Sequence, residues 1–272
     1  MANHNFTDTI PNQFHPTKIL NIDDHSNFLK MLAGFLMTDR ILITFSRSTN
    51  AIEWLINYEQ QAKYQDFFHA DLQTLASFLN NDKRFIQLSV ISCDYHMPLQ
   101  NGVEIFETIA ANTKFPYRRI LLTGINRERL ANELTHVDQI LFKDQLAADV
   151  NAFLPLLLEF EAQFFSTLFA ANDSPAILKN QHFIAYFNQM IHDNNIVEGY
   201  LIEHGHVFVL IDRDGNMFKL PIDDTLVSSS AEKNNATITL ENINDAISSP
   251  IFSYEDYITN VLSQSLEPQE AE

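Results

Sequence analysis

The chain has 272 residues, enough for one large domain or two small ones, and 46% of them are hydrophobic. We expect no membrane-spanning helix, because no apolar run reaches about 18 residues, and the single cysteine excludes an intrachain disulfide. A formal net charge of −18 disfavours binding of the whole chain to nucleic acid.

The amino-terminal segment does not read as a targeting sequence. Residues 1–20 are polar and include Pro11 and Pro16, whereas a secretory signal needs a basic region, an apolar stretch and a cleavage site. Cys93 is the only cysteine, so the sequence has no set of disulfides of the kind that is typical of proteins in oxidising compartments. We therefore expect a cytoplasmic protein.

Strands and helices are predicted to alternate along the first half of the chain. Apolar or β-branched runs predict strands at residues 18–22, 41–45, 88–92, 119–123 and 139–142. Helical spacing of apolar residues predicts helices at residues 28–37, 48–58, 103–111 and 127–134. This alternation implies right-handed crossovers and a parallel sheet covered on both faces. Ligands bind such sheets beyond the carboxyl ends of the strands.

Polar side chains follow four of the predicted strands: Asp23 and Asp24, then Asp94, Thr123 and Lys143. Three carboxylates at one edge of a sheet need a cation, and hard oxygen ligands suit Mg²⁺. A carboxylate beside that metal can attack phosphorus and form an acyl phosphate. A threonine hydroxyl and a lysine ammonium can hold phosphoryl oxygens. Considered alone, the acidic pair could equally cap the helix that follows it.

The ordered set resembles the receiver domain of bacterial response regulators. Residues 93–102, with the sequence CDYHMPLQNG, are similar to that family's phosphoacceptor loop. Residues 122–124 (LTG) and Lys143 match the ends of its fourth and fifth strands. The separations of 29 residues from Asp94 to Thr123, and of 20 from Thr123 to Lys143, are close to the family pattern. The resemblance implies a five-stranded, parallel, doubly wound (flavodoxin-like) receiver domain at residues 16–150, after an N-terminal extension at residues 1–15.

The resemblance also implies roles for these residues. Asp94 would receive a phosphoryl group from a sensor histidine kinase or a phosphotransfer protein, and Thr123 and Lys143 would bind that group. Asp24 is the better candidate of the acidic pair for direct metal coordination. The implied Mg²⁺ ligands are Asp23, Asp24, Asp94 and the backbone carbonyl of His96.

The sequence departs from the family pattern at three points. Asp144 follows Lys143 where receivers usually have proline, and Ile140 stands where they often carry an aromatic switch residue. The interval from Asp24 to Asp94 is 70 residues, which is longer than the family pattern. We expect the surplus, at residues 59–84, to be a helical insertion on one face of the receiver. It would serve either as a partner-docking surface or as decoration.

The segment after the predicted receiver reads as helix from residue 145 to 171, interrupted at Pro155. Its second part is apolar almost all round and must be buried. A linker helix at residues 151–171 could pack against the downstream module, or it could pair with a second copy in a homodimer. The dimer contacts would come from Leu157, Phe160, Phe164 and Leu168.

The sequence predicts a smaller α+β module at residues 172–262 and a disordered acidic tail at residues 263–272. After a break at residues 172–175 come one helix and three short strands, at residues 197–203, 207–212 and 217–222. Residues 212–216 lack the glycine spacing and closing glutamate of a calcium loop. Residues 203–206 (EHGH) could bind a metal, but they fit a hairpin turn better.

The output of this module is predicted from its charge. From Ala171 onward there are 16 acidic and four basic side chains, a balance of −12, and no basic recognition helix. We expect a non-enzymatic switch whose module binds another protein or dimerises, without binding DNA. A receiver that controls an unrecognised enzymatic output is the alternative, and a scaffold with an inactive receiver is disfavoured by the complete Asp/Thr/Lys set.

Overall fold

The computed structural model describes residues 4–36, 40–125, 134–149, 153–222, 240–247 and 251–264. The chain divides into two compact units, and neither is continuous in sequence. We call Thr17–Tyr64 with Gln87–Phe164 the parallel-sheet unit, and Met1–Pro16, Gln65–Ile86 and Phe165–Glu272 the antiparallel-sheet unit. The helix predicted at residues 127–134 and the predicted tail fall almost entirely outside the described residues.

The parallel-sheet unit contains a five-stranded sheet in the order β3-β2-β4-β5-β6, with every neighbouring pair parallel. Its strands are β2 (Lys18–Ile22), β3 (Leu42–Phe45), β4 (Leu88–Asp94), β5 (Arg118–Thr123) and β6 (Gln139–Phe142). Its helices are α1 (Ser26–Leu36), α2 (Ser48–Gln61), α4 (Gly102–Asn112), α5 (Lys143–Ala148) and α6 (Phe153–Leu168). The predicted doubly wound parallel fold is confirmed.

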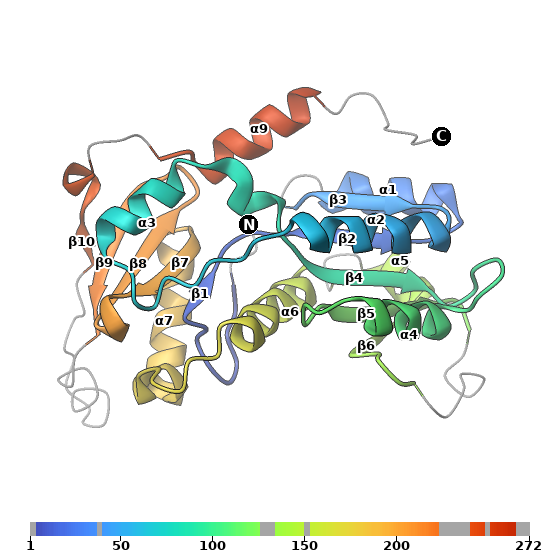
Figure 1. Ribbon diagram of the computed structural model, residues 1–272, viewed down its shortest axis with the longest axis horizontal. Helices are drawn as coiled ribbons and strands as arrows, with labels where there is room; N and C mark the ends of the chain where they lie inside the picture. The colour runs from blue at the N-terminus through green and yellow to red at the C-terminus, as the bar shows by residue number, and fades with distance from the viewer. Residues whose placement is uncertain are drawn as a thin grey trace. The chain divides into compact units, whose positions relative to one another are not determined.

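Helices cover both faces of this sheet. Figure 1 shows α2 and α4 on one face and α1 and α5 on the other. The core on the α1 side joins Leu32 of α1, Leu146 of α5 and Leu157 of α6 to strand residues such as Val90. All seven residues of the central strand β4 are buried, as expected for a strand covered on both faces. Its buried Ser92 hydroxyl donates to Asn21 Oδ1 at 2.8 Å, so this polar group does not lack a partner.

Helix α6 differs from its prediction in two respects. Pro155 does not interrupt it, because the proline lies in the first turn, where its missing N–H costs no helical hydrogen bond. Three of the four residues predicted at a dimer interface, Leu157, Phe160 and Phe164, are at most 5% exposed within the single chain, and Leu168 is half-buried. The apolar surface on which that prediction depended is therefore already largely covered.

The antiparallel-sheet unit contains a five-stranded sheet in the order β1-β7-β8-β9-β10. Its strands are β1 (Gln13–Phe14), β7 (Ile196–Ile202), β8 (Val207–Asp212), β9 (Met217–Pro221) and β10 (Glu241–Asn242). Its α-helices are α3 (Leu72–Leu79), α7 (Gln181–Asp193) and α9 (Tyr254–Gln264). Its short 3-10 segments are η1 (Asp82–Ile86), η4 (Ala176–Lys179), η5 (Glu203–Gly205) and η6 (Asn244–Ala246). The predicted α+β composition is confirmed.

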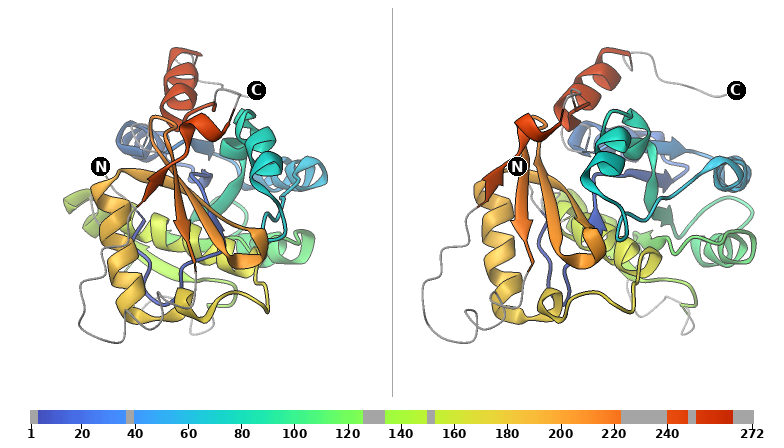
Figure 2. Two further views of the ribbon diagram at one scale, coloured as in Figure 1. Left: turned by 90° about the vertical axis from the view of Figure 1, so that its left-hand side faces the viewer. Right: turned by 60° about the vertical axis from the view of Figure 1, so that its left-hand side comes forward.

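Two helices lie against opposite faces of the antiparallel sheet, as Figure 2 shows for α3 and α7. Alternate residues of the strands point to opposite faces. Tyr200 and Val209 share a buried cluster with Leu75 of α3. On the other face, the ring of Phe208 lies 5.3 Å from that of Phe187 in α7. The sheet is thus the middle layer of its unit.

The domain boundaries differ from those predicted. The N-terminal residues are not an extension of the receiver, because β1 pairs with β7 of the antiparallel sheet. Residues 65–86 are not an insertion on the receiver, because their apolar side chains Phe67, Leu75 and Leu79 are buried in the core of the antiparallel-sheet unit. Most of α6, by contrast, belongs to the parallel-sheet unit rather than to a linker.

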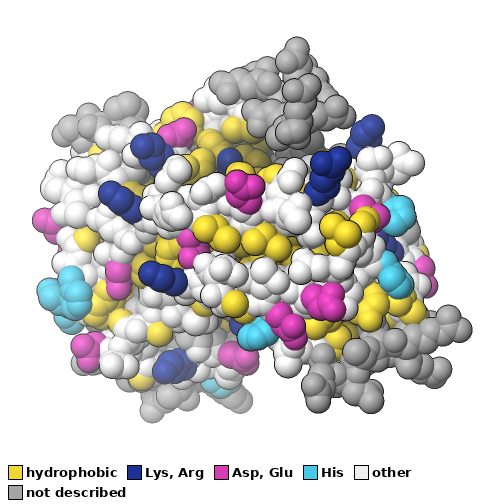
Figure 3. Space-filling view, turned by 45° about the vertical axis from the view of Figure 1, so that its right-hand side comes forward, with side chains coloured by type: hydrophobic (Ala, Val, Ile, Leu, Met, Phe, Trp, Pro, Cys, Tyr) yellow, Lys and Arg dark blue, Asp and Glu magenta, His cyan; other side chains and the backbone are white. Residues whose placement is uncertain are grey.

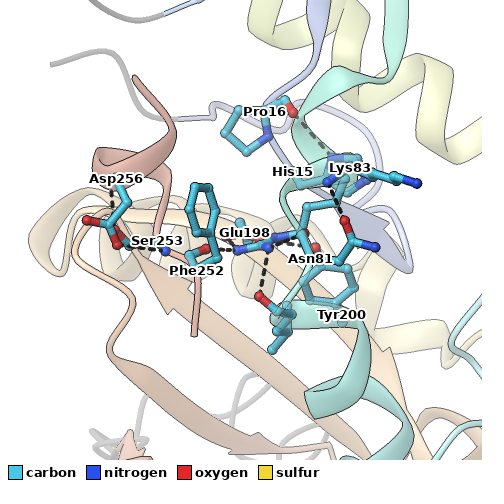
Figure 4. Close-up of polar contacts among 11 residues, drawn as sticks. His15, Pro16, Asn81, Lys83, Glu198, Tyr200, Phe252, Ser253 and Asp256 are labelled. Carbon is cyan, nitrogen blue, oxygen red and sulfur yellow. Dashed lines mark hydrogen bonds and ion pairs between the residues drawn. The ribbon is translucent and has the colours of Figure 1, made fainter. Parts of the chain in front are cut away.

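A buried ion pair fixes residues 65–86 to that unit. Arg84 and Glu198 are both fully buried, and Arg84 Nε donates to Glu198 Oε2 at 2.7 Å. The guanidinium also donates to the backbone carbonyls of Leu79, Asn81 and Phe252. Tyr200 donates its hydroxyl to the same Glu198 oxygen at 2.8 Å, and Figure 4 shows Glu198, Tyr200, Asn81 and Phe252 around this network. Both charges are therefore paired and hydrogen-bonded, as burial requires.

Candidate phosphoryl-acceptor site

The candidate site lies at the carboxyl end of the parallel sheet. Asp23 directly follows β2, Asp94 is the last residue of β4, and Lys143 directly follows β6 as the first residue of α5. The strands β2 and β4 are neighbours, so their ends deliver two carboxylates to one place. The structure thus brings together three of the residues that the sequence singled out.

Lys143 bridges the two buried carboxylates. Its Nζ lies 2.8 Å from Asp23 Oδ2 and 3.0 Å from Asp94 Oδ2. The side chain of Asp23 is fully buried, and that of Asp94 is 4% exposed. The ammonium also lies 4.7 Å from the centre of the Phe28 ring, a cation–π distance. Both carboxylates are therefore held in place by a single positive charge.

The surroundings of Asp94 raise the pKa of its carboxyl despite this lysine. Burial raises the pKa of the Asp94 carboxyl above its ordinary value, and nearby Asp23 adds to the rise. The hydrogen bond and charge of Lys143 lower the pKa, as does a hydrogen bond from the backbone of His96, but they do not cancel the effect of burial. An additional cation at the site would favour the ionised carboxylate.

Asp24 and His25 complete a cluster with the two buried carboxylates. Within the part of the chain that the structure describes, Asp23, Asp24, His25 and Asp94 are the only group of three or more potential metal ligands, with ligand atoms within 4.8 Å of one another. If ionised, three carboxylates beside one lysine leave two negative charges, which suits a divalent cation. Carboxylate oxygens are the ligands that Mg²⁺ prefers, so these residues fit that ion.

Thr123 and His96 lie where the resemblance implies. Thr123 ends β5, is fully buried, and its Oγ1 accepts a hydrogen bond from the backbone N–H of Ile125 at 3.0 Å. This bond leaves the Thr123 hydroxyl proton available for a phosphoryl oxygen. The backbone of His96 contacts the Asp94 carboxyl. The predicted role of its carbonyl as a metal ligand stays a prediction.

The loop after Asp94 requires glycine at its end. A Cβ atom on Gly102 would lie 2.5 Å from the backbone oxygen of Asp94 and 2.7 Å from Leu121 Cδ1. Asn101 caps α4 by accepting from the backbone N–H groups of Val103 and Glu104. Gly102 therefore allows the start of α4 to pack directly against the backbone of Asp94.

Three features outside the site also have structural explanations. Burial raises the pKa of the Cys93 thiol well above its ordinary value, so a reactive thiolate is disfavoured. Residues 203–206 form the η5 turn between β7 and β8, as predicted, and His204 Nδ1 lies 2.9 Å from His69 Nδ1. The Asp212 carboxylate accepts two hydrogen bonds from Asn216 within a turn.

His25 is the member of the cluster that sequence reasoning missed. Its position after the acidic pair reads as the start of a helix, and α1 does begin at Ser26. The sequence carries no spacing signal for an imidazole ligand there. Only the distances between its Nδ1 and the carboxylates identify it.

Comparisons with known proteins agree with this fold. No family model and no curated protein match the sequence. Among solved structures, the response regulator LqsR of Legionella pneumophila is 23% identical, with a TM-score of 0.63 over 79% of this chain and 68% of that one. A receiver domain from Clostridium thermocellum is 22% identical, with a TM-score of 0.38 over 56% and 98% of the two chains. The response regulator TrrA of Thermotoga maritima is 19% identical, with a TM-score of 0.34 over 50% and 97%.

The likeness to LqsR covers a larger share of this chain than the parallel-sheet unit makes up, so it extends into the antiparallel-sheet unit. None of the described helices has the length and apolar character that spanning a membrane requires. Sheet order, helix placement and the carboxylates at the strand ends lead to one assignment. The parallel-sheet unit has the receiver fold of response regulators.

Proposed function

We propose that this protein is a phosphorylation switch in which Asp94 accepts a phosphoryl group in a Mg²⁺-dependent reaction. The observation that carries the proposal is the contact of buried Asp94 Oδ2 with Lys143 Nζ at 3.0 Å, beside the carboxylates of Asp23 and Asp24. Such a site positions one nucleophilic oxygen among groups that can balance the charge of a phosphoryl group.

The residues divide the work as follows. An Asp94 carboxylate oxygen forms a bond to phosphorus while the bond from phosphorus to the donor breaks. Lys143 and the hydroxyl of Thr123 bind the phosphoryl oxygens. Asp23, Asp24, Asp94 and the His96 carbonyl would hold a Mg²⁺ ion, whose chemical contribution would be positive charge beside the phosphoryl oxygens. The phosphodonor is a phosphohistidine on a sensor histidine kinase or a phosphotransfer protein.

Labelling with a small phosphodonor tests this proposal. We expect acetyl phosphate to label the wild-type protein only when Mg²⁺ is present, and Asp94→Asn to abolish the label. Asp144→Asn is a matched control, because Asp144 is an exposed carboxylate next to Lys143. Loss of labelling in the control, or its persistence in Asp94→Asn, would contradict the assignment.

We propose further that the antiparallel-sheet unit acts by binding another protein and not by catalysis or DNA binding. The balance of −12 after Ala171 repels a phosphate backbone. Figure 3 shows one face of the whole molecule, on which basic side chains stand among acidic and uncharged ones. Arg84 and Glu198 of this unit are fully buried and form an ion pair with each other.

An enzymatic output is the second candidate function for the antiparallel-sheet unit. A pull-down with the beryllofluoride-treated protein distinguishes the outputs. A partner retained only in that state supports protein binding, whereas turnover of a small molecule by the full chain supports an enzyme. Homodimerisation through α6 stays a prediction, and light scattering over a dilution series tests it. Burial of Leu157, Phe160 and Phe164 within the single chain leaves little apolar surface for such a dimer.

A further inference from the structure

We propose that His25 is a metal ligand of the phosphoryl-acceptor site and makes this site prefer a first-row transition-metal dication such as Mn²⁺ over Mg²⁺. This inference rests on the proposed function only in placing a metal among Asp23, Asp24 and Asp94. It adds a nitrogen donor to a site otherwise built from oxygen.

The distances from His25 fit a shared coordination shell. Its Nδ1 lies 3.0 Å from Asp24 Oδ1, 3.5 Å from Asp23 Oδ1 and 4.0 Å from Asp94 Oδ2. With metal–ligand distances of about 2.1 Å, adjacent ligands of an octahedral ion are separated by about 3.0 Å and opposite ligands by about 4.2 Å. The separations of 3.0 and 4.0 Å are close to those of adjacent and opposite ligands, and the separation of 3.5 Å lies between the two.

The two oxygens of Asp23 face different partners. Oδ2 lies 2.8 Å from Lys143 Nζ and accepts no hydrogen bond, whereas Oδ1 accepts the backbone N–H of His25 at 2.9 Å. The lysine therefore occupies one side of the carboxylate and the histidine the other. A cation that contacts Oδ1 meets the imidazole and not the ammonium.

The start of α1 fixes the His25 backbone at this point. The His25 carbonyl accepts hydrogen bonds from the N–H groups of Phe28 and Leu29, at 2.9 and 3.2 Å. The side chain itself is 68% exposed, so an ion can reach Nδ1 from solvent. Because the backbone makes these contacts, a substitution of the imidazole leaves the helix start intact.

The ligand set decides the choice of metal. Carboxylates and water suit both Mg²⁺ and Mn²⁺, whereas a neutral imidazole is a ligand of transition-metal dications and adds little for Mg²⁺. A mixed set of three carboxylates and one imidazole therefore gains affinity for Mn²⁺ from His25, while its affinity for Mg²⁺ comes mainly from the carboxylates.

Metal binding to the full chain tests this inference without use of phosphorylation. We expect His25→Gln to weaken Mn²⁺ binding on the order of tenfold, in the range found for loss of groups that support a metal. Mg²⁺ affinity should change by less than about threefold. The Mn²⁺-loaded wild type should also show a ¹⁴N coupling in electron spin-echo spectra that His25→Gln abolishes.

A remote histidine is the control. His136 is exposed and lies before β6, at the opposite end of the sheet, so His136→Asn should keep the ¹⁴N coupling. Asparagine suits that position because the φ of His136 is 60°. Absence of ¹⁴N coupling in the wild type, or an equal loss of Mn²⁺ and Mg²⁺ affinity in His25→Gln, would overturn the inference.

The two proposals fail separately. Normal labelling of Asp94 by acetyl phosphate together with no ¹⁴N coupling rejects the His25 ligand alone. A ¹⁴N coupling lost in His25→Gln, in a protein that acetyl phosphate does not label, rejects phosphoryl acceptance and keeps the metal site.

Discussion

Substitution of Gly102 by alanine would place an atom against the backbone of Asp94, the proposed phosphoacceptor. The new Cβ would lie 2.5 Å from the Asp94 backbone oxygen and 3.1 Å from its carbonyl carbon. These are backbone atoms of a fully buried central strand, so they cannot rotate away as a side chain could. The nearby Leu121 Cδ1, at 2.7 Å, can move only within a packed core.

The expected cost follows from two opposing effects. Overpacking costs roughly 1–3 kcal/mol, and a clash with backbone atoms that cannot rotate away falls in the upper part of that range, about 2–3 kcal/mol. Alanine recovers at most about 1 kcal/mol relative to glycine by its preference for helix, since Gly102 begins α4. We therefore expect Gly102→Ala to lower the free energy of unfolding by about 1–2 kcal/mol. Because the clash displaces Asp94, labelling by acetyl phosphate should fall as well.

Gly34 provides the matched control. It lies inside α1, and a Cβ there would meet nothing within 4 Å. Gly34→Ala should therefore stabilise the protein by about 0.5–1 kcal/mol through helix preference alone. Urea unfolding measures both variants. If Gly102→Ala were as stable as the wild type and fully labelled, the close approach of α4 to Asp94 would not be a constraint.

Three further predictions concern the buried groups and the domain boundary. Arg84→Met should lower the free energy of unfolding in urea by about 3–5 kcal/mol, because it leaves Glu198 buried without its partner. Lys83→Met, at an exposed position, is the control, and a loss under about 1 kcal/mol for Arg84→Met would contradict the prediction. Burial raises the pKa of the Glu161 carboxyl in the folded state above its value in the unfolded state, so the folded state binds the proton more tightly. The free energy of unfolding should therefore fall as the pH rises from the unfolded-state pKa to the folded-state pKa, and Glu161→Gln should remove this pH dependence. A shortened protein with residues 17–164, in which a short Gly-Ser linker replaces residues 65–86, should fold and accept a phosphoryl group. The two ends to be joined lie close together, because Tyr64 Oη donates to the Leu88 carbonyl at 2.8 Å; a circular dichroism spectrum typical of an unfolded chain would contradict the domain boundary.

The parallel sheet and most of its site could be predicted because their signals are local. Each strand is a short apolar run, and the polar residue that matters comes directly after it, as with Asp94 after β4. Parallel strands bring their carboxyl ends to one edge, so sequence order alone indicates that Asp23, Asp94 and Lys143 converge. Nothing in that reasoning requires knowledge of how distant segments pair.

The strands β7, β8 and β9 of the antiparallel-sheet unit could be predicted, but the segments that join them from the first third of the chain could not, because those contacts are distant in sequence. The apolar face of α3 fits any sheet, and the sequence does not say that it packs on residues such as Tyr200 and Val209. The two residues of β1 are too short a strand to be recognised without their partner β7. A charged residue, Arg84, reads as exposed until Glu198 is placed beside it.

The order in which the segments of the two units follow one another along the chain affects the order of folding. Every segment of the parallel-sheet unit precedes β7 in the chain, so that unit can form before the antiparallel sheet has a partner for β1 or α3. Until β7 and β8 are added, the apolar residues of α3 have no core to join, and closing such distant contacts costs chain entropy that slows folding. The buried Arg84–Glu198 pair can form only at this late step, since its two partners come from different segments of the unit. Residues 65–86, which precede β4 in the chain, therefore reach their final state only when the second unit folds, whereas β4 itself belongs to the parallel-sheet unit and can form earlier.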